Sequence, residues 1–153
     1  MNHRRLLSVD ANRPSPPAAS LALFAAWLLT LVSTLSVLFV GEVMGQEPCL
    51  LCWYQRAFMF PLVIVLGIAA ARSDSSVWIY ALPLAGAGWL LALYHNLLYF
   101  AVIPEAIKPC GAGPSCSGAD MTVLGALPLP SLSLAVFTLL IILLLTTRRN
   151  ARP

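Results

Sequence analysis

Charged side chains are scarce in this sequence. Asp, Glu, Lys and Arg make up 10% of its 153 residues, while hydrophobic residues make up 59%. Soluble domains usually carry about 25% charged residues, so these few charges cannot cover a water-exposed surface. The sequence also lacks a basic patch interleaved with aromatic residues, and its net charge is only +3. These absences argue against a water-soluble domain and against a nucleic-acid partner.

The charges that are present separate long uncharged tracts. These tracts cover residues 20–41, 57–71, 75–104 and 121–147. A helix needs about 20 residues to cross the hydrocarbon core of a bilayer, and the first, third and fourth tracts are long enough. The second tract has 15 residues and spans only if its helix begins earlier, near residues 49–53. The sequence therefore predicts an all-α integral membrane protein, a four-helix bundle surrounded by membrane lipid.

The polar N-terminal residues differ in character from the rest of the chain. Residues 1–17 contain three prolines and three arginines, and we expect a disordered arm there, followed by a membrane domain at 18–148 and a tail at 149–153. The arm and first tract could also be a signal peptide. However, 22 uncharged residues are long for such a peptide and no A-x-A cleavage site follows, so the first helix is expected to be retained.

Lys and Arg are divided unevenly between the two ends of the predicted helices. One side holds seven: Arg4, Arg5, Arg13, Arg72, Arg148, Arg149 and Arg152. The other side holds only Arg56 and Lys108. Because Lys and Arg favour the cytoplasmic side, both termini and the turn at 72–75 are predicted to be cytoplasmic. The loops at 42–52 and 104–121 are then extracytoplasmic. They hold all four cysteines, which suits an oxidising compartment.

The first of these loops ends in a C-x-x-C pair, Cys49 and Cys52, followed by Arg56. Pro48 suits a helix start, because its missing N–H would have no partner there. A thiolate near a helix N-terminus is stabilised by unpaired N–H groups and by the helix dipole, which favours redox chemistry. Arg56 follows Cys52 by four residues and shares its helix face. A permanently charged guanidinium there would favour a thiolate, and equally a reduced quinone anion.

Other interpretations of this segment stay open. A disulfide could be purely structural, although a bridge closing so short a loop stabilises by only about 2 kcal/mol on the entropy model. All four cysteines could bind zinc, since C-x-x-C is also a metal-ligand spacing. Arg56 could snorkel to lipid head groups, although the cost of an intramembrane charge makes a functional interpretation the default.

A second cysteine pair lies in the Pro- and Gly-rich second loop. Five residues separate Cys110 from Cys116, which permits a bridge. An exposed bridge in a flexible loop is open to attack by a thiolate. It could be only a loop staple, but two dithiols on the same side of the membrane favour a relay.

His95 is an ionisable residue late in the third tract. It should lie in the same outer leaflet as Arg56, so the two could flank one quinone head group, with His95 donating a hydrogen bond to a carbonyl. The alternative is a structural hydrogen bond between helices. The sequence does not decide between the two.

Residues 48–56 read Pro-Cys-Leu-Leu-Cys-Trp-Tyr-Gln-Arg. This stretch, followed by the pair Cys110 and Cys116, resembles the disulfide-bond-formation protein B (DsbB) family of bacterial membrane thiol oxidases. The residues of the motif and the close spacing of the second cysteine pair resemble its BdbC-type branch. The resemblance covers nearly the whole chain, with four helices, a C-x-x-C pair opening the second, and another pair in the second outer loop.

The resemblance implies redox disulfides that join Cys49 to Cys52 and Cys110 to Cys116. It implies that a soluble thioredoxin-like oxidase of the DsbA/BdbD type arrives reduced and attacks the loop disulfide at Cys110. Electrons would pass to the C-x-x-C pair, and Cys52 would deliver them to ubiquinone or menaquinone in the bacterial inner membrane. Arg56 matches the quinone-site arginine of the family.

Two rival functions remain at this point. A quinone reductase of the vitamin K epoxide reductase type has a similar bundle and similar cysteines, but it places its loop pair before its C-x-x-C pair, the reverse of the order here. A non-enzymatic membrane protein would use the cysteines as staples or as zinc ligands.

Overall fold

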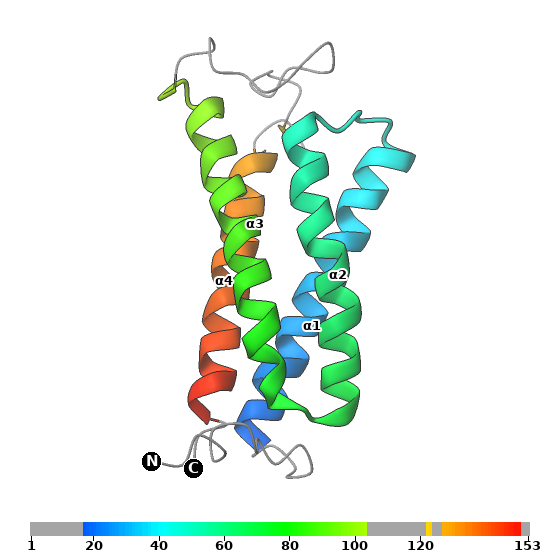
Figure 1. The fold of residues 1–153 in the computed structure, drawn as a ribbon. Helices are drawn as coiled ribbons and strands as arrows, with labels where there is room; N and C mark the ends of the chain where they lie inside the picture. The colour runs from blue at the N-terminus through cyan, green and yellow to red at the C-terminus, as the bar shows by residue number, and fades with distance from the viewer. Residues whose placement is uncertain (1–16, 104–121, 124–126, 151–153) are drawn as a thin grey trace.

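The computed structural model describes residues 17–103, 122–123 and 127–150. Its long helices are α1 (Pro17–Leu38), α2 (Leu50–Arg72), α3 (Trp78–Tyr99) and α4 (Leu129–Asn150). Short elements flank them: a π-helical turn η2 (Phe39–Val43), a 3-10 turn η3 (Ser75–Val77), and two strands, β1 (Thr122–Val123) and β2 (Leu127–Pro128), which pair antiparallel. The long helices lie side by side and form one bundle (Figure 1).

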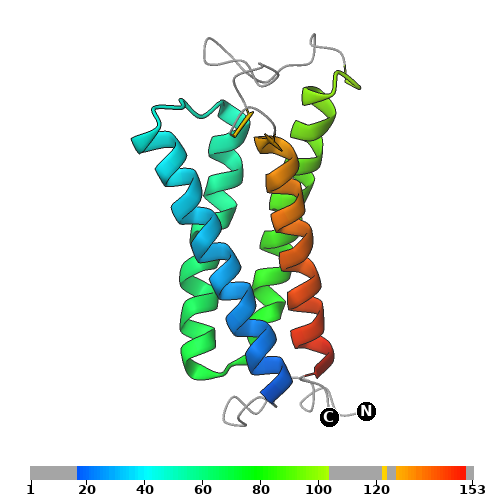
Figure 2. The ribbon, with the colours of Figure 1, turned by 180° about the vertical axis from the view of Figure 1, so that it is seen from behind.

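The helices alternate in direction along the bundle. α1 begins and α4 ends at the end of the bundle where α2 turns into α3, and α2 begins at the opposite end (Figures 1 and 2). α1 packs against α2 and α4, and α3 packs against the same two helices. All four are long and apolar enough to cross a membrane. The predicted all-α, four-helix membrane bundle is confirmed.

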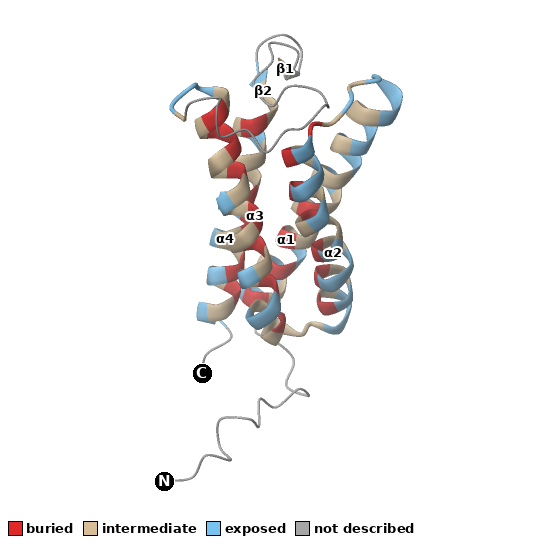
Figure 3. Cartoon of the chain, turned by 45° about the horizontal axis from the view of Figure 1, so that its top comes forward, coloured by how far each residue is buried: buried red, intermediate tan, exposed pale blue. Residues whose placement is uncertain are grey.

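Buried side chains gather along the axis where the four helices meet, while the outward faces are exposed (Figure 3). The largest fully buried side chains of the main core cluster are Leu23, Leu62, Leu66, Phe137, Leu140 and Leu144. The outward faces are themselves apolar, with exposed side chains such as Ile64, Tyr80 and Leu90. An apolar surface over whole helices is tolerated only in lipid, because water would drive it to aggregate.

Small residues allow close approach between helices. Gly88 of α3 faces Phe137 of α4, and a Cβ added to Gly88 would overlap the aromatic ring. Gly67 of α2 faces Trp27 of α1, whose Nε1 would lie 2.8 Å from an added Cβ. Membrane helices associate by such packing because lipid gives no hydrophobic force between them.

The turn between α2 and α3 is short and well capped. Ser73 adopts a left-handed conformation with φ 52°, and its N–H bonds the carbonyls of Ala69 and Ala70. The side chain of Asp74 accepts a 2.9 Å hydrogen bond from the Ser76 N–H, which starts η3. These local bonds satisfy backbone groups where the helices end, and the turn falls at the predicted residues 72–75.

The second helix begins before its uncharged tract at 57–71, as the shortness of that tract required. α2 starts at Leu50 and has 23 residues, so the prediction of a start near residues 49–53 is confirmed. The fourth helix starts later than the fourth uncharged tract, since the strand pair precedes Leu129. An uncharged tract bounds a helix but does not fix its first residue, and here Pro128 and Pro130 mark the boundary.

Candidate active site

The C-x-x-C pair lies at the start of α2. Cys49 is the N-cap residue, and its Sγ accepts a 3.4 Å hydrogen bond from the backbone N–H of Cys52. The two sulfurs are free thiols 3.1 Å apart. Pro48 directly precedes the N-cap residue, at the helix start that the sequence predicted there. The cysteine itself does the capping, which places its sulfur on the unpaired N–H groups of the helix.

The surroundings of Cys49 favour its thiolate. Hydrogen bonding with the Cys52 side chain lowers the pKa of the Cys49 thiol to about 4, although burial acts in the opposite direction. The His95 side chain and the Cys52 N–H add to the lowering. A thiol with so low a pKa is ionised at neutral pH, and the thiolate is the reactive form in disulfide exchange.

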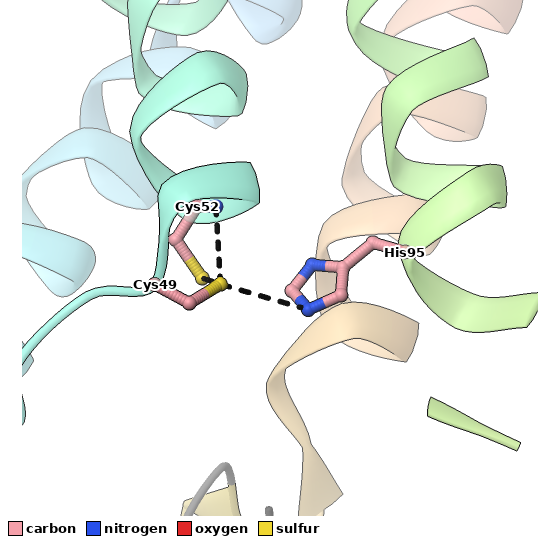
Figure 4. A group of neighbouring side chains, drawn as sticks. All are labelled: Cys49, Cys52 and His95. Carbon is pink, nitrogen blue, oxygen red and sulfur yellow. Dashed lines mark hydrogen bonds between the residues drawn. The ribbon is translucent and has the colours of Figure 1, made fainter. Parts of the chain in front are cut away.

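His95 reaches the cysteine pair from α3 (Figure 4). Its Nε2 lies 3.8 Å from the Cys49 Sγ, and the residue is only 1% exposed. Its Nδ1 lies 3.1 Å from the Nε2 of Gln55 on α2. The interhelical hydrogen bond that the sequence left open is therefore present, and the same imidazole also contacts the Cys49 sulfur.

Gln55 is a site residue that sequence reasoning missed. It is buried, three residues after Cys52, and its Oε1 accepts a hydrogen bond from Ser133 of α4. This amide therefore joins α2, α3 and α4 around His95. Its only signal in the sequence was a polar side chain inside a spanning helix, which is costly unless it is paired.

A neighbouring set of hydrogen bonds holds the C-terminal part of α3 against the start of α4. Asn96 donates to the carbonyl of Pro130 at 2.6 Å, and Ser131 donates to the Asn96 Oδ1 at 2.8 Å. Because Asn96 follows His95 directly, these bonds hold the backbone that carries the imidazole. The position of His95 is thus set by both of its neighbouring helices.

The side chain of Arg56, on α2, reaches across to α1. Its Nη2 donates to the Val37 carbonyl at 3.1 Å, and its guanidinium lies over the Trp53 ring, 5.3 Å from the centroid. The guanidinium also packs against Gly41 in η2, where an added Cβ would lie 3.3 Å from Nη2. Within the part of the chain that the structure describes, these contacts use few of its five N–H donors, which leaves others for a ligand.

A cavity of about 680 Å³ joins these side chains. The C-terminal half of α1, the first turns of α2 and α4, and His95 of α3 surround it. Valine, leucine and methionine form much of its wall, and the side chains of Cys49, Cys52, Gln55, Arg56 and His95 also line it. An apolar cavity of this size with a few polar groups is typical of a site for an organic cofactor.

Several predicted features lie outside the described residues. Cys110 and Cys116 are among them, as are the N-terminal arm before Pro17 and the last residues of the tail. Of the predicted site residues that the structure describes, Cys49, Cys52 and His95 lie together, and Arg56 lines the same cavity.

Comparison with known proteins agrees with this geometry. The family model described as "Disulfide bond formation protein DsbB" matches residues 18–147. A "Probable disulfide formation protein" of Metapseudomonas resinovorans is 58% identical over 132 residues, 86% of this chain and 92% of that relative. "Disulfide bond formation protein C" of Bacillus subtilis is 40% identical over 120 residues, 78% of this chain and 87% of that relative.

A third relative, a "Probable disulfide formation protein" of Chlamydia trachomatis, is 39% identical over 131 residues, 86% of this chain and 95% of its own length. No solved structure matches the chain. With its four spanning helices, the protein is a multi-pass membrane oxidoreductase that forms disulfides. The chain belongs to the disulfide bond formation protein DsbB family.

Proposed function

We propose that the protein is a thiol:quinone oxidoreductase, which reoxidises a thioredoxin-like partner of the DsbA/BdbD type outside the cytoplasm and reduces ubiquinone or menaquinone. The observation that carries this proposal is the shared cavity. A dithiol, a guanidinium and an imidazole line one apolar space of about 680 Å³, which suits a flat, apolar acceptor with polar oxygens. A bound quinone would supply the sink for two electrons and two protons.

The electrons follow two successive thiol–disulfide exchanges. The reduced partner attacks the disulfide of Cys110 with Cys116, leaves oxidised, and leaves two thiols behind. Those thiols in turn reduce the disulfide of Cys49 with Cys52. The C-x-x-C pair then gives up two electrons and two protons to the acceptor and re-forms its disulfide bond, so the cycle closes without net change in the protein.

Each of the described site residues has a separate role in this last electron transfer. Cys52 is partly exposed and would pass electrons to the acceptor, whereas Cys49 is fully buried beside His95. The His95 Nε2 is placed to exchange a proton with the Cys49 sulfur. Arg56 holds a positive charge on the same cavity wall, where negative charge develops on the acceptor.

The proposal also includes the orientation of the chain in the membrane and its location in the cell. Three of the four arginines in the described ranges, Arg72, Arg148 and Arg149, lie in the last turns of α2 and α4, at one end of the bundle. The positive-inside rule assigns that end to the cytoplasm. The cysteines then face outward from a bacterial inner membrane, with residues 18–148 as the thiol oxidase domain and both termini inside.

Purified full-length protein in lipid nanodiscs tests this proposal. It is given a reduced thioredoxin-like oxidase together with ubiquinone or menaquinone, and quinone absorbance and partner thiols are followed. We expect one quinone reduced for each partner disulfide formed, and no reduction by the Cys52→Ala variant. If partner thiols disappear with no loss of quinone, or if Cys52→Ala reduces quinone at the normal rate, the proposal is wrong.

A further inference from the structure

The two thiols and the imidazole form a set of metal-ligand atoms. Sγ of Cys49, Sγ of Cys52 and a ring nitrogen of His95 all lie within 4.8 Å of one another. We propose that the reduced form of this protein binds a thiophilic divalent cation, Zn²⁺ or a similar ion, through these three residues. The ligand set differs from a site made of four cysteines, because it draws one ligand from another helix and needs neither loop cysteine.

The distances suit tetrahedral coordination. With Zn–S near 2.3 Å and Zn–N near 2.0–2.1 Å, neighbouring ligand atoms lie roughly 3.5–3.8 Å apart. The two sulfurs are 3.1 Å apart, and the Cys49 Sγ is 3.8 Å from the His95 Nε2. Side-chain shifts below about 1 Å would bring all three atoms onto one ion.

The imidazole already has the support that metal-binding histidines use. Such histidines donate their other ring N–H to a fixed acceptor. The Nδ1 of His95 faces the amide of Gln55, which Ser133 also contacts. A half-turn of that amide presents its oxygen to an Nδ1–H, and this leaves the Nε2 lone pair facing the sulfurs. Ser133 can accept from the amide nitrogen in that arrangement, so no partner is lost.

Charge and access are also favourable. Two thiolates and a neutral imidazole give a neutral complex with a divalent cation, so little charge is buried without compensation. The cavity that touches all three residues provides an entry path and room for a water molecule as fourth ligand. A three-ligand site with an open fourth position is a common arrangement for zinc.

Binding would follow the redox state of the pair. The cation replaces the thiol protons, which are released, and no electrons move. The disulfide has no thiolate and does not bind. A bound cation therefore holds the protein reduced. Where the proposed function applies, it would block re-formation of the disulfide by the acceptor, but the binding itself does not depend on which acceptor is used.

The test uses Co²⁺ as a spectroscopic probe and requires no turnover. The full-length protein carries Cys110→Ser and Cys116→Ser, which remove the loop thiols, and is reduced and freed of metal before titration. We expect a single Co²⁺ to bind with thiolate charge-transfer and tetrahedral bands, to be displaced by Zn²⁺, and to be absent from oxidised protein. Quinone is omitted, so failure here is distinct from failure of the proposed function.

Variants separate this site from simple chelation by the dithiol. His95→Gln should weaken binding at least about tenfold, and Gln55→Leu by about 10–100-fold, as for other residues that orient a ligand. His3→Gln is the matched control and should change nothing. His95→Cys should keep binding and intensify the charge-transfer band, which shows that a folded protein accepts a third ligand at this position. Absence of tetrahedral bands, or unchanged affinity in His95→Gln, would overturn the proposal.

Discussion

Replacing Arg56 with alanine should impair use of the quinone far more than exchange with the partner. Arg56 lies on the cavity wall with Cys52 and is held there by the Val37 carbonyl and the Trp53 ring. In the proposed reaction, negative charge develops on the acceptor as electrons leave Cys52, and a fixed positive charge would stabilise that state. Losing one such preorganised group costs about 10²–10³ in rate, or about 2.7–4 kcal/mol.

The same change also has a structural cost, which must be measured separately. A hydrogen bond from a charged donor contributes about 1.5–3 kcal/mol, and a cation–π contact about 0.5–1 kcal/mol at an exposed site. Trp53→Leu removes the ring and keeps the charge, so it reports the contact alone. Arg56→Lys keeps a charge but has no planar fork to bind both the Val37 carbonyl and the acceptor, so we expect only partial recovery of the rate.

The assay is the initial rate of quinone reduction against quinone concentration, with mixed-disulfide formation measured in parallel. Arg72→Ala, at the other end of the same helix, is the matched control and should behave as the parent protein. If Arg56→Ala leaves the quinone dependence unchanged, or weakens only the mixed disulfide, then Arg56 is a snorkelling anchor and the reasoning is refuted.

Four other predictions follow from the relay, the topology, the packing and the charge at the thiol. Given the partner in its oxidised form, the free Cys110 thiol of Cys116→Ala should open the partner's disulfide and form a mixed disulfide at Cys110, with the partner's second cysteine released as a thiol; a peptide map that finds the partner on the C-x-x-C pair would reverse the order of the relay. A reporter active only outside the cytoplasm, fused to the C-terminus, should be silent, and strong activity there contradicts the topology. Gly88→Ala should lower the free energy of unfolding by about 1–3 kcal/mol through overpacking, while Gly86→Ala, with no neighbour within 4 Å of its added Cβ, should not; equal denaturation midpoints would contradict this. The thiolate absorbance of Cys49 in reduced, metal-free protein should persist at neutral pH and fall only as the pH drops through about 4, and a midpoint near the ordinary thiol value would disprove it.

The number of long helices, and the early start of the second, could be predicted because the bilayer imposes a minimum length. The 15 uncharged residues of the second tract were too few, so the helix had to include the segment that follows Cys49. The structure agrees, with α2 running from Leu50 to Arg72. By contrast, no rule of length indicated the π-helical turn after α1, because an extra residue in a turn leaves the apolar pattern almost unchanged.

The site was predicted in its parts but not in its contacts. Helical spacing placed Arg56 on the face of Cys52, and both line one cavity. Spacing within one helix says nothing about rotation of its neighbours, so it could not show that His95 reaches Cys49. The pairing of Gln55 with His95 was missed for the same reason, since it depends on how α2 and α3 are turned toward each other.

The cavity reaches the side of the bundle as well as its interior. Val32 of α1 and Leu132 of α4 line it, and their side chains are 59% and 38% exposed, so neither of these two side chains closes the cavity off. A molecule dissolved among the acyl chains can therefore arrive sideways, without crossing water. The relevant concentration of such a molecule is then its mole fraction in the bilayer, not its concentration in water. It reaches the cavity by two-dimensional diffusion in the membrane. Under the proposed function, the rate of disulfide formation outside the cytoplasm would thus depend on the composition of the membrane rather than on that of the surrounding fluid.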